Sequence, residues 1–429
     1  MSRVLVTPFV ISWLAILSLF SLPSANRVAM AEQQRPSFRI EIQQITFGTS
    51  NTFFGYIGHV RTIPWNEDGR YVLALRSQFQ NRMPLPHEPA DIVLIDTRND
   101  FHPEVIEQTR AWNFQQGTML YWNPMSPKSQ FFFNDRDPAT NDVFCVLYDV
   151  AKRKRIAEYR YADTPIGNSG VAQQGGWILG INYGRLARLR PVTGYPGVRD
   201  WSAAEKHPTH DGIFKIDSVT QAKELLVSYK AMGDAVRHLR SDVDEKDLFV
   251  NHTLWSRNDS RIFVFVRGDF EISGKRLDIP LTMNPDGTDL TPLALHIGGH
   301  PEWKSDNVLI GSYEKKQVLF DVSRQQITGS IGSIEQIPNA GGDVALSPDG
   351  EWFVNGFGQG GKNYYNVVRL ADGAWTRSVG INQGGFLTGE LRIDSSPLWN
   401  RAGNQLLVCG VPDSTPSTRQ LFLLTIRPN

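Results

Sequence analysis

One short pattern recurs along the chain and constrains its fold more than any other feature. Its strongest copy is Asn251–Arg267, in which a polar start leads into a strand ending at Trp255, a tight turn, and a second strand. Similar units occupy Pro64–Leu75, Tyr121–Phe133, Gly167–Asn182, Pro301–Ile310, Val344–Val354 and Ser396–Val408. Asp-Gly pairs such as Asp68-Gly69 and Asp349-Gly350 supply the positive φ that tight hairpin turns require.

The repeat predicts an all-β fold, a seven-bladed β-propeller. Each of the seven copies is followed by a further strand and a polar turn, so about four strands belong to each unit. A four-stranded sheet cannot bury both of its faces alone, whereas sheets arranged radially bury each against the next. The alternatives are a β-sandwich, or a ring of six or eight blades if the weak copy at Gly167–Asn182 is misread.

The two ends of the chain are expected to close the ring. Phe38–Thr46 alternates between apolar and polar residues, as a half-buried strand does. The strand Leu421–Ile426 has no later blade to join. The sequence therefore predicts that the amino-terminal strand pairs within the last blade, which would remove two exposed sheet edges at once.

Two segments interrupt the repeat. Leu186–Asp211 is rich in Arg, Pro and Gly and shows no periodicity. A loop of this length in a compact domain is usually functional or disordered, and its arginines, with Tyr195 and Trp201, could cover a sugar or an anionic ligand or form only a surface flap. Thr220–Asp247 is expected to be helical in part and to decorate the edge of a blade.

The amino terminus predicts export. Arg3 gives a positive start, Phe9–Leu22 is an apolar run too short to span a bilayer comfortably, and Ala29–Ala31 is a small-x-small cleavage site. We expect a signal peptide at residues 1–31 and a single propeller domain at residues 32–429. The mature protein would be periplasmic or secreted, without membrane contact. Cleavage after Ala25, or retention as an anchor, are the alternatives.

Charge and cysteine content exclude several classes of protein. Lys+Arg and Asp+Glu both total 44, so the chain lacks the basic bias of a general nucleic-acid binder. Cys145 and Cys409 lie within apolar strand patterns and are expected to be buried thiols rather than a disulfide. No nucleophile elbow, phosphate-binding loop or dinucleotide motif occurs in its required context, which argues against serine hydrolases, nucleotide enzymes and NAD enzymes.

Polar residues recur just before the inner strand of most units. In a propeller such segments meet at one end of the central channel, the usual ligand site, although any one of them could equally be a solvated loop residue. These residues are His59, Arg61, Trp112, Asn113, Gln115, Gln116, Asn251, His252, His300, Asp343, Glu390, Arg392 and Asp394. A metal site needs three converging ligands, and His252 and His300, helped by His59 and by Asp343 or Asp394, could supply them.

The chain resembles the exported β-propellers related to oligogalacturonate lyase and to the TolB-like and WD-like propellers. The likeness covers nearly all of the mature chain and rests on Pro64–Leu75, Arg110–Met119, Phe133–Arg136, Asn182–Gly197, Asn251-His252 and Thr388–Trp399. The bacterial branch that it resembles most usually has a histidine in each of several inner loops. His252 and His300 are retained, whereas Asp343 and Ser396 stand where further histidines are usual.

The resemblance implies a manganese-dependent lyase that cleaves by β-elimination beside a uronate carboxylate. It would place a Mn or Ca ion near His252, His300 and Asp343, make Arg392 the partner of the carboxylate, and leave His59 or His252 as the base. Further ligand contacts are expected from Trp112, Gln115, Arg136, Arg185, Tyr195, Asn251, Glu390 and Asp394.

Two functions follow from this sequence. The first is an exported propeller that binds an acidic oligosaccharide, with or without metal-assisted cleavage. The alternative is a non-catalytic propeller that binds a small ligand or a protein partner, its metal site having degenerated. The missing histidines favour the second, and the retained His252, Arg392 and Asp394 favour the first.

Overall fold

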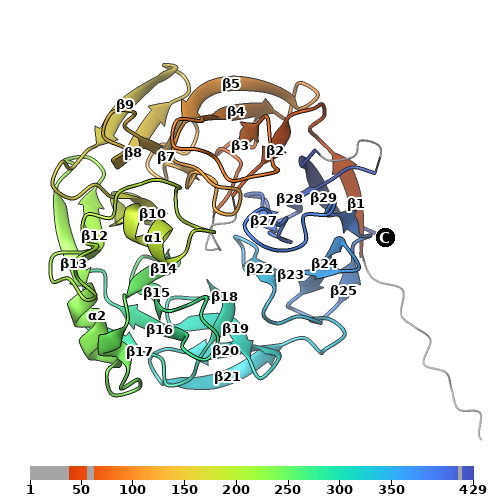
Figure 1. Cartoon of the computed structure of the whole chain (residues 1–429). Coiled ribbons are helices and arrows are strands. Elements are labelled where there is room, and N and C mark those ends of the chain that lie inside the picture. Colours follow the sequence, from red (N-terminus) through yellow and green to blue (C-terminus); the bar gives the residue numbers. More distant parts are fainter. Residues whose placement is uncertain (1–37, 56–61, 414–417) are drawn as a thin grey trace, which may run out of the picture. The chain divides into compact units, whose positions relative to one another are not determined.

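The structure, a computed structural model, describes residues 38–55, 62–413 and 418–429. In this part of the chain the strands form seven antiparallel sheets that follow one another around a ring (Figure 1). The predicted seven-bladed β-propeller is therefore confirmed, and the weak copy at residues 167–182 is a blade like the others. The predicted signal peptide lies outside the described residues and stays a prediction.

Each blade is a meander of four strands that runs outwards from the channel. Blade 1 consists of β2 (Asn51–Phe53), β3 (Tyr71–Ser77), β4 (Ala90–Asp96) and β5 (His102–Thr109). Blade 2 consists of β6 (Tyr121–Trp122), β7 (Gln130–Arg136), β8 (Val143–Asp149) and β9 (Lys154–Tyr159). Blade 3 consists of β10 (Gly167–Val171), β11 (Trp177–Ile181), β12 (Gly212–Asp217) and β13 (Lys223–Ser228). Blades 4 and 5 are β14 (Phe249–Trp255), β15 (Ile262–Gly268), β16 (Leu277–Met283) and β17 (Thr291–Pro292); and β18 (Gly298–Trp303), β19 (Val308–Tyr313), β20 (Lys316–Asp321) and β21 (Gln326–Ile331).

Blade 6 has an additional short strand, and blade 7 takes one strand from the other end of the chain. Blade 6 consists of β22 (Asp343–Leu346), β23 (Trp352–Gln359), β24 (Lys362–Arg369), β25 (Trp375–Arg377) and the additional β26 (Ile381–Asn382). Blade 7 consists of β27 (Leu398–Trp399), β28 (Gln405–Gly410), β29 (Gln420–Pro428) and β1 (Phe38–Gln44). β1 pairs antiparallel with β29 over its whole length, from Phe38 opposite Pro428 to Gln44 opposite Phe422. The predicted closure of the ring by the amino-terminal strand is confirmed.

The tryptophans of the repeat hold neighbouring blades together. The indole N–H of Trp122 donates to the carbonyl of Pro64, that of Trp303 to Leu254, and that of Trp399 to Ala345, at 2.7, 3.1 and 3.1 Å. Each bond runs from the inner strand of one blade to the blade before it. Because these indoles are at most 5% exposed, the same side chain supplies apolar burial and a satisfied donor. This explains why an aromatic residue recurs at one place in the unit.

Local sequence determines the turns and the helix caps, whereas pairing with a neighbouring strand determines the edge strands. Gly69 and Gly350 have φ of 69° and 77°, as expected for their Asp-Gly turns. The expected partly helical segment contains α2 (Tyr229–Val236), capped by the Ser228 hydroxyl, and the short 3-10 helix η1 (Val243–Glu245). The preceding residues 223–228 form β13 instead, because they complete the outer edge of blade 3 by pairing with β12.

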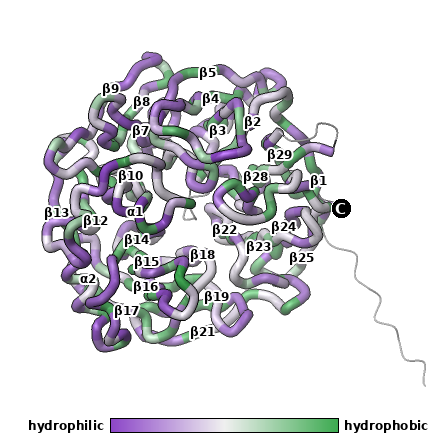
Figure 2. Tube along the Cα trace, in the orientation of Figure 1, coloured by the Kyte–Doolittle hydropathy of each residue, from purple (hydrophilic) through white to green (hydrophobic). Residues whose placement is uncertain are grey.

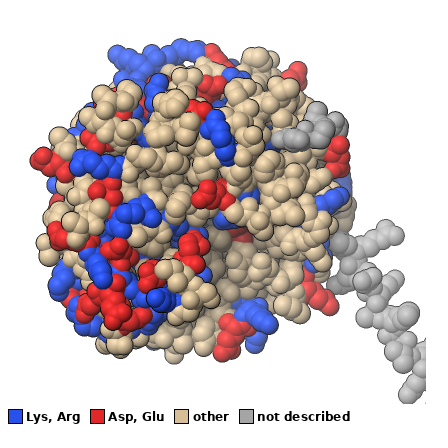
Figure 3. All heavy atoms as spheres, viewed as in Figure 1, with Lys and Arg blue, Asp and Glu red and all other residues tan. Residues whose placement is uncertain are grey.

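The distribution of polarity follows this architecture. Figure 2 shows hydrophobic stretches along the strands and hydrophilic stretches in the connections. Figure 3 shows acidic and basic side chains interspersed over α2 and the neighbouring blade edge, where Lys230 pairs with Asp234 and Arg237 with Asp244. No helix of the described residues is both long enough and apolar enough to cross a membrane.

Candidate ligand site at the mouth of the channel

Connections from several blades meet at the end of the ring where the inner strands begin. The Gln115 side chain reaches from the loop before β6 to the loop before β27, where its amide donates to the carbonyls of Glu390 and Arg392 at 3.1 and 2.9 Å. Gln116 donates to the Asn251 side chain at the start of blade 4, at 3.3 Å. The predicted meeting of like-placed segments is thus observed in blades 2, 4 and 7, and these contacts fix the loops relative to one another.

Two histidines are aimed by irregularities in their strands. His252 has a φ of 61°, and the register of β14 against β15 shifts between Asn251 and Leu254. β18 shifts in the same way around His300, between Gly298 and Glu302. Such bulges turn a side chain away from the ordinary alternation of a strand and are frequent beside functional sites. The two imidazole rings lie edge to face with their centroids 5.7 Å apart.

His300 forms a close pair with the first residue of the next inner strand. Its Nδ1 lies 3.1 Å from Oδ1 of Asp343, whose other oxygen accepts from the Ser395 hydroxyl at 3.3 Å. The His300 side chain is 30% exposed, but the surrounding protein groups keep most water from its ring. This desolvation lowers the pKa of His300 to about 4. Burial, and then the nearby Asp394 carboxylate, raise the pKa of Asp343 well above its usual value. At neutral pH the His300 ring is therefore uncharged.

Arginines surround this pair. Arg392 donates from Nε to Asp394 at 2.7 Å and from Nη1 to the carbonyl of Gly389, and its side chain is 31% exposed. Arg190, Arg267 and Arg276 gather around the ring of Phe270, with their guanidinium carbons 4.1, 4.4 and 3.6 Å from its centroid. The charges of Arg267 and Arg392 add to burial in lowering the pKa of His300, and in lowering the pKa of Arg190 to about 10.

Other residues expected at a ligand have structural contacts instead. Trp112 is fully buried in an aromatic cluster and donates to the carbonyl of Glu88. Tyr195 is fully buried and stacks on Tyr183 at 4.3 Å. Arg136 and Arg185 are at most 1% exposed. A ligand cannot reach these four side chains in this arrangement of the loops.

Arg185 has a defined structural role. It lies in α1 (Tyr183–Leu189), which the Asn182 side chain caps. The guanidinium donates to the carbonyls of Ser202, Glu205, Lys206 and Leu248. Through these four backbone oxygens Arg185 ties the excursion, the loop of residues 190–211 that follows α1, to α1 and to the start of blade 4. The sequence alone could not show this, since such carbonyls are not coded by residue type.

The sequence missed some residues and named others that the structure does not describe. His59 and Arg61 lie outside the described residues, so their expected places at the mouth stay predictions. Arg267 was not singled out because it ends a strongly apolar strand, yet it lies beside the site and pairs with Asp278 at 2.7 Å. Its only sequence signal is a charge at the channel-mouth end of an otherwise apolar strand.

The described part of the mouth does not by itself fit the metal ion that the resemblance implies. His252, His300 and Asp343 are neighbours, as expected. Among residues 38–55, 62–413 and 418–429, however, no three His, Cys, Asp or Glu side chains are placed to hold a metal. The expected Mn or Ca ion stays a prediction. The cysteines are free and buried, as expected.

Fold and site together define a seven-bladed β-propeller with a polar, arginine-rich mouth at one end of its channel. No protein-family model matches the chain, and no curated protein does. Solved structures that are similar include TolB from Acinetobacter baumannii, at 11% identity and a TM-score of 0.36, covering 78% of this chain. The chain spans only 56% of that TolB chain.

Two β-propeller domains match over more of their length. The Cps50 (Swd1) propeller domain of Myceliophteria thermophila is 10% identical, with a TM-score of 0.48, and 90% of this chain covers 99% of it. The propeller domain of the trilobed protease of Pyrococcus furiosus is 10% identical, with a TM-score of 0.46, and 87% of this chain covers 95% of it. At such identities the likeness concerns the fold alone.

Proposed function

We propose that this propeller binds the carboxylates of a uronate-containing oligosaccharide at the mouth of its channel. The observation that carries the proposal is the surplus of guanidinium groups beside an uncharged His300. Arg190, Arg267, Arg276 and Arg392 lie there with the carboxylates of Glu271, Asp278 and Asp394. The one further carboxyl group that the structure describes there, that of Asp343, has a pKa raised well above its usual value by burial, so guanidinium charge exceeds carboxylate charge. A site with this balance favours an anionic ligand, and guanidinium pairs carboxylates in a bidentate way.

Arg392 is the residue best placed to contact the ligand. Nε and Nη1 donate within its own loop, and none of the described residues accepts a hydrogen bond from Nη2. The side chain is fixed by Asp394 yet 31% exposed. A carboxylate that approaches from the channel would therefore meet a pre-oriented donor, which limits the entropy lost on binding.

Cleavage by β-elimination is the second candidate function. That reaction needs a base for the proton next to the uronate carboxylate and a cation for the enolate-like anion that develops. Arg392 would supply the positive charge, and His252, on its bulge beside His300, would be the base. The alternative is a non-catalytic propeller that takes a small ligand or a protein partner at the same mouth. The proposed location is the periplasm or the exterior, on the strength of residues 1–31.

Calorimetric titration with trigalacturonate tests the binding proposal. Arg392→Gln should weaken binding by about tenfold or more, since hydrogen bonds to charged groups contribute about 1.5–3 kcal/mol. Arg98→Gln, in a turn at the opposite end of the ring, is the matched control and should bind as the native protein does. Equal affinities for the native protein and Arg392→Gln, or no binding by the native protein, would refute the proposal.

The same protein separates binding from cleavage. A lyase would release unsaturated product, followed by its ultraviolet absorbance, and His252→Ala should abolish this signal while the ring remains folded. A binder would retain trigalacturonate unchanged. Metal analysis of the purified protein, together with binding measured before and after chelation, decides whether residues outside the described ones complete a metal site.

A further inference from the structure

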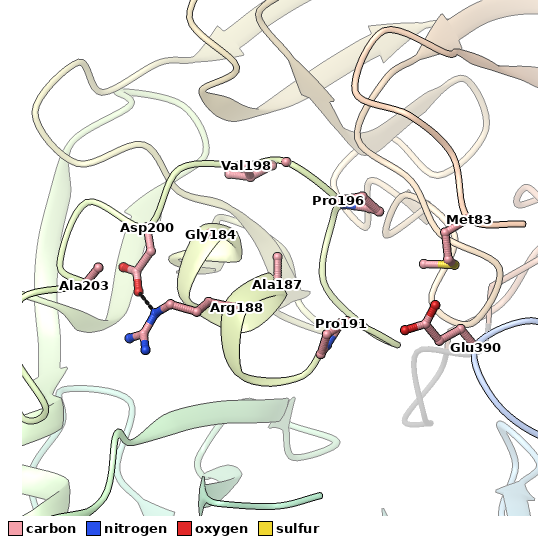
Figure 4. A pocket seen from close by; sticks show the side chains of 11 residues that line it. Met83, Gly184, Ala187, Arg188, Pro191, Pro196, Val198, Asp200, Ala203 and Glu390 are labelled. Atoms are coloured by element: carbon pink, nitrogen blue, oxygen red, sulfur yellow. Dashed lines mark hydrogen bonds and ion pairs between the residues drawn. The ribbon is translucent and has the colours of Figure 1, made fainter.

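A second site lies beside the mouth, on the outer side of α1. A cavity with a volume of about 500 Å³ lies between α1, the excursion that follows it, and the loops carrying Met83 and Glu390. This volume is within the range of about 300–1,000 Å³ that small-molecule sites occupy. Figure 4 shows its walls, with the Glu390 carboxylate below the Met83 thioether and an Arg188–Asp200 pair at the far side.

The cavity is built rather than accidental. Gly194 packs so closely on α1 that an added Cβ would lie 2.2 Å from the Cα of Ala187. A Cβ added to Gly184 would likewise lie 2.1 Å from the carbonyl oxygen of Arg199 in the returning chain. Arg185 fixes the end of the excursion from below. The wall is thus tied to the helix at several points, and a preformed wall loses little entropy when a ligand binds.

Apolar groups form most of the lining. The side chains of Met83, Ala187, Pro191, Pro196 and Val198 all face the cavity. None of them offers a hydrogen bond, so a ligand gains here mainly by removing apolar surface from water. The ligand therefore needs an apolar body.

The charges at the cavity are net negative. Arg188 is neutralised twice, by Asp200 at 2.9 Å and by Asp247 at 2.8 Å. Glu390 lies in an exposed loop, and its carboxylate has no ion-pair partner among the residues that the structure describes. One cationic group on the ligand would complete the charge balance.

We infer that this cavity binds an organic cation with an apolar body, its ammonium group paired with Glu390. The inference goes beyond the proposed uronate site, because the chemistry is of opposite charge and Arg392 takes no part in it. Benzylammonium is a suitable probe, since its ring matches the apolar walls. Benzyl alcohol and benzoate are isosteric controls with a neutral and a negative group.

Met83 provides a readout at the cavity itself. In protein labelled at the methionine methyl groups, benzylammonium should shift the Met83 signal saturably, with a Kd in the millimolar range. Benzyl alcohol should bind about threefold to fivefold more weakly, as expected for an exposed ion pair, and benzoate should not saturate. Met83→Leu assigns the signal. The other methionine signals report that each variant is folded.

Glu390→Gln should lower the affinity for benzylammonium to that for benzyl alcohol. Glu351→Gln, an exposed carboxylate at the other end of the ring, should change nothing. The inference is overturned if both ligands bind Glu390→Gln and the native protein equally, or if no ligand shifts the Met83 signal. Repeating the titration with trigalacturonate present keeps the two proposals separate. Failure of trigalacturonate to bind would refute the uronate site and leave the benzylammonium result standing.

Discussion

Arg185 offers the sharpest test of how the wall of the mouth is held. Its guanidinium is fully buried and donates to four backbone carbonyls, those of Ser202, Glu205, Lys206 and Leu248. Arg185→Ala removes this donor and leaves the four buried carbonyl oxygens without it. The excursion would then lose its connection to α1 and to blade 4.

The size of the effect follows from these contacts. Hydrogen bonds from a charged donor contribute about 1.5–3 kcal/mol each, but they are not additive, because part of the loop can relax. Each buried acceptor that is left without its donor costs about 1–3 kcal/mol. We expect a loss of about 4 kcal/mol. In a domain of this size, at about 2 °C per kcal/mol, Tm should fall by about 8 °C.

Arg188→Ala is the matched control, on the same helix. Arg188 pairs with Asp200 and Asp247, but 33% of its side chain is exposed, so its loss should cost less than about 1 kcal/mol. Scanning calorimetry and limited proteolysis within residues 190–211 compare the two variants. The reasoning fails if both have the same Tm and the same cleavage rate. Native stability combined with lost trigalacturonate binding in Arg185→Ala would make Arg185 a ligand contact instead.

Three further outcomes are expected. Trp303→Phe should cost about 1 kcal/mol more than Trp255→Phe in urea unfolding, because the Trp303 indole donates a hydrogen bond whereas the buried Trp255 Nε1 has no partner among the described residues; equal costs would contradict this. Arg82 holds the pKa of Glu88 at about 2, so the stability that this pair contributes is present above pH about 4.5 and lost as the pH falls towards 2. Glu88→Gln should remove this part of the pH dependence of Tm. The pair's contribution to the free energy of unfolding should be less than about 1 kcal/mol, since the pair is largely solvated. Gly194→Ala should lower Tm by overpacking against α1, at a cost of about 1–3 kcal/mol, and an unchanged Tm would show that the excursion can move.

The fold was predictable because its determinants are local and repeated. The Asp-Gly turns at residues 68–69 and 349–350 and the inner-strand tryptophans of several units specify a hairpin and the side that it buries. The segment Thr220–Asp247 is helical in part, as expected, but the sequence did not show which part. Residues 223–228 have helical propensity but complete the edge of a sheet, a nonlocal interaction that no short window contains.

The site was less predictable, because polarity does not distinguish a ligand contact from a structural one. Asn251, His252, His300 and Arg392 do meet at the mouth, since their places in the repeat set their places in space. Arg185 looks equally suited to a ligand in the sequence, yet all but one of its hydrogen-bond acceptors are backbone oxygens, the exception being the Ser202 hydroxyl. Such acceptors become visible only when the chain is folded.

The strand pair that joins β1 to β29 has a consequence for the order of events during folding. Its partners, such as Phe38 and Pro428, are separated by almost the full length of the propeller chain. Six blades can assemble from neighbours in sequence, but the seventh must wait until the last residues have left the ribosome. Closing so long a loop is slow. Until it closes, the molecule is an open arc with two unpaired strand edges, the state most exposed to aggregation and proteolysis.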